Sequence, residues 1–363
     1  MRKNKYYLGF LVFAILILFA PSCTKSSKSS TPSGTILKEI DIGGSTGILP
    51  GLSPGDITYN NADNSIWVVT AASLSTISYV VKFDLKGNFI TYTAVGHGAM
   101  HLASDKQGDV WVSVMNDNLL VELDPNGKII NQFNVGIRPW YINTDPSGNI
   151  WTLNSGPTCL GTCSGPPYVA SFTEITTNGN VIAGFSFSTP FEGPFTFDQS
   201  GNIWVANGYA NSFITEMNVN GTVIKSFSAN SSSFPTSIFG DNMIFDNNGN
   251  LWLVNSRTSD GTNDNLVTKV YTTTNKAPEN YSMGGMYPWG ISVDHNNNIW
   301  VTGLYSNTVT KINNSGQGIE VYRFDQFQQL SSPTGPVSIT IDKNNNIWFT
   351  DNREDGYVIE LAP

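Results

Sequence analysis

The side chains best suited to ligand binding are a few arginines and aromatic residues at the ends of predicted strands. Arg257 and Arg353 come two residues after strands ending in Asn255 and Asp351, and Arg138 precedes a Pro-Trp pair. A planar guanidinium binds carboxylate, phosphate or sulfate through two parallel hydrogen bonds. Nearby aromatic residues offer stacking faces: Trp140, Tyr209, Tyr287, Trp289 and Tyr305. This set predicts a site for an anionic or glycan-like ligand. The alternative is that the arginines pair locally with acidic residues.

A second group of side chains could hold a divalent cation such as Ca²⁺ or Mg²⁺, because such ions accept carboxylate and carboxamide oxygens. The candidates are Asn154, Glu192, Asn207, Asn255 and Asp351. Nothing in their spacing distinguishes them from ordinary polar loop residues. The sequence therefore predicts no required cofactor, and a metal site is kept as the alternative.

The histidines give no metal-binding motif. His97 and His101 are four residues apart in a predicted extended segment, which places them about 13 Å apart, too far to share one ion without a bend. We expect a solvated or packing role for both. The chain also lacks a phosphate-binding P-loop, a nucleophile elbow and a Cys/His cluster, so nucleotide-dependent and nucleophilic mechanisms are not expected.

Composition narrows the range of partners. The chain has 363 residues, 19 Lys plus Arg and 28 Asp plus Glu, for a net charge of −9 at pH 7. An acidic chain is not attracted to nucleic acid or to anionic headgroups. Only 13% of the residues are charged, and the apolar content allows a sizeable core. We expect a small-molecule, glycan or protein ligand, with no nucleic acid partner.

Residues 1–22 have the layout of a secretory signal, with a basic start followed by the apolar run Leu8 to Ala20. The small residues before Cys23 resemble the lipobox of bacterial lipoproteins, which implies lipidation of Cys23. Residues 23–34, rich in Ser and Lys, would form a flexible tether. We expect a protein of the bacterial cell envelope, facing the periplasm or on the cell surface, that contacts the membrane through its lipid only. Simple secretion is the alternative.

Two further cysteines, Cys159 and Cys163, stand in a glycine-rich stretch. An oxidising envelope favours a local disulfide between them, and free thiols are the alternative.

A repeated phrase organises residues 35–363. An alternating apolar strand, an Asp or Asn, a Gly/Asn turn and an aliphatic-Trp strand recur seven times, with tryptophans 40 to 53 residues apart at positions 67, 111, 151, 204, 252, 300 and 348. Two more strands follow each phrase. Four antiparallel strands per repeat predict an all-β, seven-bladed β-propeller. We expect the tryptophans to pack between blades and the repeated Asp residues to cap turns.

The chain ends leave one blade incomplete. Only one strand follows Trp348, so residues 35–42 are expected to supply the missing outer strand. Joining both termini in one blade removes the free edges of an open stack, and predicts a single, monomeric domain over residues 35–363. Function is expected at the channel mouth, where the loops preceding each innermost strand gather.

The D-x-x-G-N-I-W-V phrase, with Pro or Gly before several strands, resembles NHL-repeat and virginiamycin B lyase-like propellers. The resemblance implies the fold. It also raises a metal-dependent lyase or lactonase as the alternative to a non-enzymatic binding protein. Such lyases are expected to use His and Glu on late blades, where this chain has Trp289-Gly290 and Pro336-Val337 instead, and His295 lies in a turn on the opposite face.

Overall fold

In the computed structural model, every regular element among the described residues is a β-strand. The described residues are 34–44, 47–71, 76–156, 170–186, 193–206, 213–228, 240–255, 265–274, 276–283, 287–315, 318–324, 335–353 and 356–363. A search of these residues finds no helix with the length and apolarity needed to cross a membrane.

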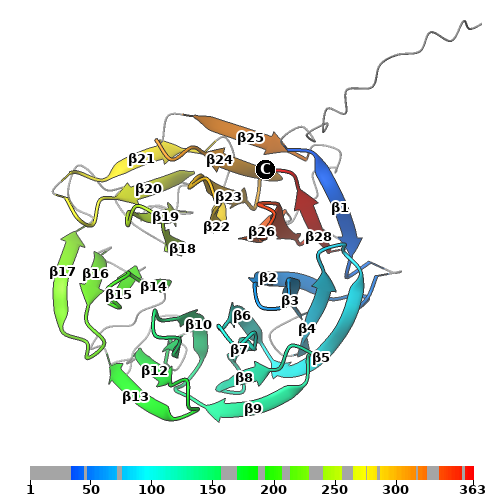
Figure 1. The fold of residues 1–363 in the computed structure, drawn as a ribbon, viewed down its shortest axis with the longest axis horizontal. Coiled ribbons are helices and arrows are strands. Elements are labelled where there is room, and N and C mark those ends of the chain that lie inside the picture. The colour runs from blue at the N-terminus through cyan, green and yellow to red at the C-terminus, as the bar shows by residue number, and fades with distance from the viewer. Residues whose placement is uncertain are drawn as a thin grey trace, which may run out of the picture. The chain divides into compact units, whose positions relative to one another are not determined.

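The strands form seven four-stranded antiparallel sheets, called blades 1 to 7 (Figure 1). Blade 1 consists of β2 (Ser53–Asn60), β3 (Ser65–Ala71), β4 (Ile77–Asp84) and β5 (Phe89–His97). Blade 2 consists of β6 (Ala99–Ser104), β7 (Val110–Val114), β8 (Leu119–Leu123) and β9 (Ile129–Asn134). Blade 3 consists of β10 (Pro139–Thr144), β11 (Ile150–Asn154), β12 (Ser171–Ile175) and β13 (Val181–Ser186). Blade 4 consists of β14 (Phe195–Phe197), β15 (Ile203–Ala206), β16 (Phe213–Met217) and β17 (Val223–Ser228). Blade 5 consists of β18 (Gly240–Phe245), β19 (Leu251–Asn255), β20 (Leu266–Val270) and β21 (Glu279–Ser282). Blade 6 consists of β22 (Pro288–Val293), β23 (Ile299–Gly303), β24 (Thr308–Ile312) and β25 (Ile319–Arg323). Blade 7 is β26 (Pro336–Ile341), β27 (Ile347–Asp351), β28 (Tyr357–Leu361) and β1 (Ile36–Asp41).

The blades close into a ring, which confirms the predicted propeller. The first strand of each blade contacts the first strands of the two neighbouring blades, and β26 of blade 7 contacts β2 of blade 1. These seven strands surround the central axis in Figure 1.

The predicted joining of the two termini is also confirmed. Strand β1 pairs antiparallel with β28, with Glu39 opposite Ile359, and so forms the outer strand of blade 7. Gly34 N–H donates to the carbonyl of Ala362 at 3.0 Å, and Ala362 N–H donates to the carbonyl of Thr35 at 2.8 Å. The N-terminal strand thus completes the blade that the C-terminal strands begin.

The tryptophans pack between blades, as the repeat predicts. Trp204 of blade 4, 1% exposed, lies in one cluster with Met243 and Leu251 of blade 5. Trp348 of blade 7 packs in the same way on Ile57 of blade 1. The same relation, each tryptophan on the following blade, holds for the other five: Trp67, Trp111, Trp151, Trp252 and Trp300. One indole therefore fills each gap between neighbouring sheets.

The repeated aspartates cap the turns and anchor the indoles. Asp246 Oδ1 accepts the backbone N–H of Asn248 and Asn250, and its Oδ2 accepts Trp252 Nε1 at 2.9 Å. The same indole bond links Asp105, Asp145, Asp198, Asp294 and Asp342 to the tryptophan six residues later. These turns lie at the ends of the blades opposite the channel mouth, so the predicted turn-capping role is confirmed.

Candidate functional site

The channel mouth is the face where the innermost strands begin. Six of the seven innermost strands have a register shift close to that end, for instance between Pro54 and Ile57 in β2 and between Ala99 and Leu102 in β6. A β-bulge bends its strand and re-aims the side chains beside it. The residues at these shifts, Asp56 and His101 among them, are therefore the ones the fold can turn towards the channel.

Two blades carry the same short segment at this face. Arg138 and Tyr287, each followed by Pro-Trp, have left-handed φ angles of +58° and +63°. Each receives a cap from an asparagine: the N–H of Arg138 donates to Asn118 Oδ1 at 2.8 Å, and that of Tyr287 to Asn265 Oδ1 at 3.1 Å. The caps hold the chain in a conformation that non-glycine residues seldom adopt. The half-buried Trp140 and Trp289 consequently take equivalent positions in blades 3 and 6.

In blade 6, three of the predicted aromatic residues come together. The rings of Tyr287 and Trp289 are nearly parallel, at 12°, with centroids 6.2 Å apart. Tyr305, from the connection between β23 and β24, meets Tyr287 edge-to-face at 4.5 Å. Tyr287 is buried, Trp289 is half-buried and Tyr305 is 42% exposed. We call Tyr287, Trp289 and Tyr305 the mouth cluster, because it presents aromatic surface at the start of an innermost strand.

Arg138 is half-buried in the equivalent position of blade 3. One terminal nitrogen of its guanidinium lies 3.3 Å from Met115 Sδ, a weak acceptor. Its Nε is buried and has no hydrogen-bond partner among the described residues. The guanidinium therefore keeps donor capacity that an anionic group could use.

Arg353 lies in a different environment. It is 7% exposed, with Nε 2.9 Å from Asp351 Oδ2 and a terminal nitrogen 3.1 Å from Glu39 Oε1. Its guanidinium also lies over the ring of Tyr357. Burial raises the pKa of Asp351, although the charge of Arg353 opposes that effect. The arrangement ties β1 to the rest of blade 7, which is the local pairing that the sequence left open as the alternative.

The three described members of the predicted metal set are dispersed. Asn154, Asn255 and Asp351 are fully buried at the ends of the second strands of blades 3, 5 and 7. Each asparagine donates to a threonine hydroxyl of the next strand in its own blade, Thr173 or Thr268. Their Oδ1 atoms are unpartnered within the described residues, but the carboxylate of Asp351 is already paired with Arg353. These three residues come from three non-adjacent blades, and we derive no metal-dependent step from them.

Several predicted residues lie outside the described part of the chain. These are Cys23, Cys159, Cys163, Glu192, Asn207, Tyr209 and Arg257, together with the signal, residues 1–22, and nearly all of the tether, residues 23–34. Lipidation, the disulfide and the roles of the other four side chains stay predictions.

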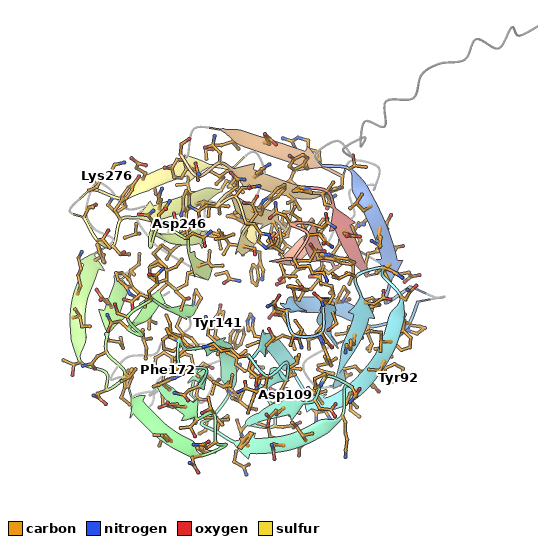
Figure 2. The ribbon with its side chains drawn as sticks, in the orientation of Figure 1. Tyr92, Asp109, Tyr141, Phe172, Asp246 and Lys276 are labelled. Carbon is orange, nitrogen blue, oxygen red and sulfur yellow. The ribbon has the colours of Figure 1, made fainter. Side chains whose placement is uncertain are left out.

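The channel wall holds a polar group that the sequence did not indicate. Asp56 in β2 lies 3.4 Å from His101 Nδ1 in β6 through its Oδ2, which also accepts Leu102 N–H at 2.8 Å. Its Oδ1 accepts the hydroxyl of Ser338 in β26. The ring of His101 stacks on Tyr141 of β10 with centroids 4.6 Å apart. Figure 2 shows Tyr141 at the inner side of the ring of blades. Blades 7, 1, 2 and 3 thus contribute one connected group.

Electrostatics favour the ionised form of Asp56. Burial by itself would raise the pKa of this carboxyl. The hydrogen bond and charge of His101, with the donors from Ser338 and Leu102, outweigh it and hold the pKa of Asp56 below its ordinary value. Asp56 is therefore a carboxylate at neutral pH.

Hydroxyl groups of the second strands fix the backbone around this group. Ser113 Oγ accepts the N–H of His101 at 3.1 Å and donates to the carbonyl of Trp140 in the next blade at 2.8 Å. Thr350 connects Ser338 to blade 1 in the same way. Each hydroxyl satisfies a backbone group freed by the bulge and links two blades.

A sequence signal for this group was present. His101, Tyr141 and Ser338 each stand ten residues before the tryptophan of their repeat, and Asp56 stands eleven before Trp67, in a repeat with a longer turn. Aligning the repeats on tryptophan would have placed all four in one layer of the channel.

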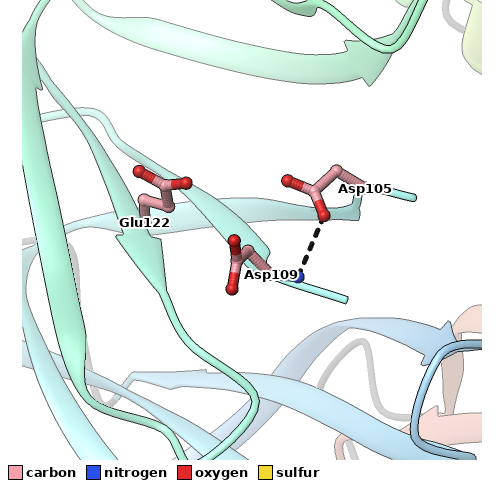
Figure 3. A group of neighbouring side chains, drawn as sticks. All are labelled: Asp105, Asp109 and Glu122. Carbon is pink, nitrogen blue, oxygen red and sulfur yellow. Dashed lines mark hydrogen bonds between the residues drawn. The ribbon is translucent and has the colours of Figure 1, made fainter. Parts of the chain in front are cut away.

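A separate acidic cluster lies on the turn face. Asp105, Asp109 and Glu122 of blade 2 each place a carboxylate oxygen within 4.8 Å of the others (Figure 3). Asp105 already accepts Trp111 Nε1 and the N–H of Asp109, and Glu122 accepts Asn131. Burial, followed by the charges of neighbouring acidic groups, raises the pKa of both Asp109 and Glu122. The carboxylates of this cluster thus repel one another, while Asp105 and Glu122 are held in place by hydrogen bonds to neighbouring groups.

Solved structures with the same fold were found by comparison. A streptogramin B lyase has 18% sequence identity and a TM-score of 0.65, covering 89% of this chain and 97% of its own. A catalytically inactive histidine variant of virginiamycin B lyase from Staphylococcus aureus, with quinupristin, has 17% identity and a TM-score of 0.68, covering 90% and 99%. The WD40 β-propeller domain of Doa1 has 12% identity and a TM-score of 0.60, covering 90% and 96%.

No protein-family model and no curated protein matches the chain. The structural similarity establishes that this chain has a virginiamycin B lyase-like propeller fold. At these low sequence identities, the shared fold does not show what activity this chain has.

Proposed function

We propose that this propeller is a binding protein whose channel mouth takes a glycan-like ligand against the mouth cluster. The observation that carries the proposal is the contact of Tyr287, Trp289 and Tyr305, which gives an aromatic surface of graded exposure at the mouth. Sugar rings expose C–H groups on one face, and flat aromatic surfaces bind such faces by dispersion and by excluding water.

Arg138 and Trp140 support the same use of this face. They are the counterparts in blade 3 of Tyr287 and Trp289, and the buried Nε of Arg138 lacks a partner among the described residues. A ligand with a carboxylate or sulfate group beside its sugar rings would pair with the guanidinium of this half-buried side chain. We therefore expect acidic glycans to bind better than neutral ones.

The experiment is binding of the purified protein to an array of neutral and acidic glycans. The variants Trp289→Ala and Tyr305→Ala are expected to lose most of the captured signal. Tyr92→Ala is the matched control, since Tyr92 is 49% exposed on the outer strand β5, at the periphery in Figure 2. The proposal is overturned when the wild-type protein captures no glycan, or when all three variants bind as well as it does.

A metal-dependent lyase or lactonase on the same scaffold is the second candidate. It is favoured by the fold shared with streptogramin B lyase and virginiamycin B lyase. This candidate predicts about one bound divalent ion per chain and an activity that chelation abolishes and Mg²⁺ or Ca²⁺ restores. Metal analysis of the purified protein, before and after dialysis against a chelator, separates the two candidates.

We further propose that the propeller is held at a bacterial membrane through a lipid on Cys23. The support is the sequence alone, with its basic and apolar residues 1–22. Cys23→Ser is expected to release the protein from the membrane fraction and to prevent its labelling by a fatty acid. Membrane association unaffected by this change would contradict the lipid anchor.

A further inference from the structure

The pair formed by Asp56 and His101 differs from the other histidine pair of the described residues. His97 Nδ1 also lies close to a carboxylate, 3.2 Å from Asp117, but these side chains are 48% and 31% exposed. The side chains of His101 and Asp56 are only 21% and 15% exposed, and the imidazole is fixed by its stack on Tyr141. The imidazole of His101 is thus held in one orientation by contacts with Asp56 of blade 1 and Tyr141 of blade 3.

This orientation decides which nitrogen is basic. Nδ1 faces an ionised carboxylate, so Nδ1 carries the proton and donates it in the hydrogen bond. In the neutral ring the lone pair then lies on Nε2, and the contacts of the ring with described residues are those of Nδ1 with Asp56 and the stack on Tyr141. Among the described residues, the titratable side chains in contact with the ring are Asp56 and Tyr141. His101 therefore presents an oriented base.

The location suits a reacting group. His101 and Tyr141 lie in the innermost strands β6 and β10, and Tyr141 directly follows Trp140 of the mouth segment. The base is thus one residue deeper along the strand than the proposed binding surface. A purely structural histidine would be expected to use both ring nitrogens in hydrogen bonds when it is mostly buried.

We propose that the Asp56–His101 pair is a general base that activates water in the channel for the hydrolysis of carboxylic esters. Nε2 takes a proton from water while the water oxygen bonds to the ester carbonyl carbon. The tetrahedral intermediate then breaks its bond to the alcohol oxygen, and Nε2–H returns the proton to that oxygen. Ester and water become acid and alcohol, and the imidazole ends neutral as it began.

The choice of an ester follows from what the described channel wall supplies. A single imidazole can move one proton in and one proton out, which is all that ester hydrolysis by water requires. Asp56 acts as a positioning residue, since it fixes the tautomer and stabilises the imidazolium that forms. This inference concerns the channel wall and stands whether or not the mouth cluster binds glycans.

The test is hydrolysis of 4-nitrophenyl acetate by the full-length protein, followed from pH 5 to 9. We expect kcat/KM to rise with pH, as for a reaction that needs a general base, with a normal solvent deuterium isotope effect. His101→Gln should lower kcat/KM about 100-fold, the usual contribution of a general base. His97→Gln and His295→Gln are matched controls and should keep the wild-type rate.

A second variant, Asp56→Asn, distinguishes a loss of activity caused by removal of the base from one caused by misfolding. In Asp56→Asn the carboxamide can donate to Nδ1, which moves the ring proton to Nε2 and removes the base while leaving the side-chain volume unchanged. We expect the same order of loss as for His101→Gln, with partial recovery in Asp56→Glu and thermal unfolding still cooperative.

Three results would overturn the proposal: a wild-type rate no higher than that of His101→Gln, an unchanged rate in a folded Asp56→Asn variant, or a solvent isotope effect of unity. The last would mean that Nε2 attacks the ester directly.

Discussion

Asp56 Oδ2 lies 3.4 Å from His101 Nδ1 across the boundary between blades 1 and 2. The other oxygen of the same carboxylate accepts a hydrogen bond from Ser338 of blade 7. One side chain therefore joins three blades at the place where the ring closes on itself. Its charge should contribute to stability as well as to the orientation of His101.

The first prediction concerns Asp56 and pH. A carboxyl whose pKa is lowered on folding adds stability above its unfolded pKa, about 3.9, and that stability is lost as the pH falls through the folded pKa. Asp56→Asn is expected to lower the free energy of unfolding at pH 7 by about 1 to 3 kcal/mol, since hydrogen bonds to a charged group are lost. Urea unfolding at pH 7 and pH 3 measures it. An equal loss at both pH values would show that the charge is not responsible.

The second prediction concerns the acidic cluster on the turn face. Where blade 2 has Asp109, blade 3 has Asn149, whose Nδ2 donates to Asp145 Oδ2 at 3.0 Å. The raised pKa of Asp109 means that stability falls as the pH rises from its unfolded pKa to its folded one. Asp109→Asn should raise the free energy of unfolding at pH 7 by about 1 kcal/mol.

The reverse change in blade 3 is the control for this prediction. Asn149→Asp recreates the repulsion beside Asp145 and should destabilise the protein by a similar amount. A stable Asn149→Asp variant, or no gain from Asp109→Asn at pH 7, would show that the repulsion is relieved in another way, such as by a bound cation.

The third prediction tests the spacer tryptophans. Trp204→Ala should lower the free energy of unfolding by about 3 to 5 kcal/mol, because it leaves a cavity between blades 4 and 5. Trp204→Phe should cost less, since it keeps an aromatic ring and loses the bond from Nε1 to Asp198. Denaturant unfolding measures both. Equal losses would assign the stability to that bond rather than to packing.

The repeats explain how much of this structure could be predicted from the sequence. The turn aspartates and the indoles recur in the repeats, so local sequence patterns were enough to predict their roles. The joining of residues 35–42 to the last blade follows from counting the strands after Trp348. All six tryptophan-to-aspartate bonds of the described residues join positions six apart, so a local sequence pattern reveals them, whereas the seventh spacer indole, Trp67, donates to Ser65.

The channel wall could not be predicted in the same way. Asp56 and His101 are 45 positions apart, in different repeats, and both stand beside bulges that no local pattern marks. The sequence indicated a solvated or packing role for His101 because it was compared with its neighbour His97 rather than with the same layer of other blades. The mouth cluster was predicted residue by residue, but only the fold shows that Tyr287, Trp289 and Tyr305 are in contact.

The fourth prediction concerns Arg353. Arg353→Ala leaves Asp351 buried without its partner and breaks the link to Glu39 of β1, so we expect a loss of about 3 kcal/mol in the free energy of unfolding. Lys276→Ala is the matched control, because its ion pair with Glu279 is exposed and should matter little. Equal effects of the two changes would mean that burial does not strengthen the Arg353 contacts.

The central claim is that the channel mouth binds its ligand through the mouth cluster. It is tested most directly by the indole N–H signals in a ¹H–¹⁵N spectrum, with Trp289 assigned from the Trp289→Phe variant, during titration with soluble acidic oligosaccharides. We predict a saturable shift of the Trp289 signal while the signals of the seven spacer tryptophans stay in place. An unchanged Trp289 signal at saturating oligosaccharide would contradict the account.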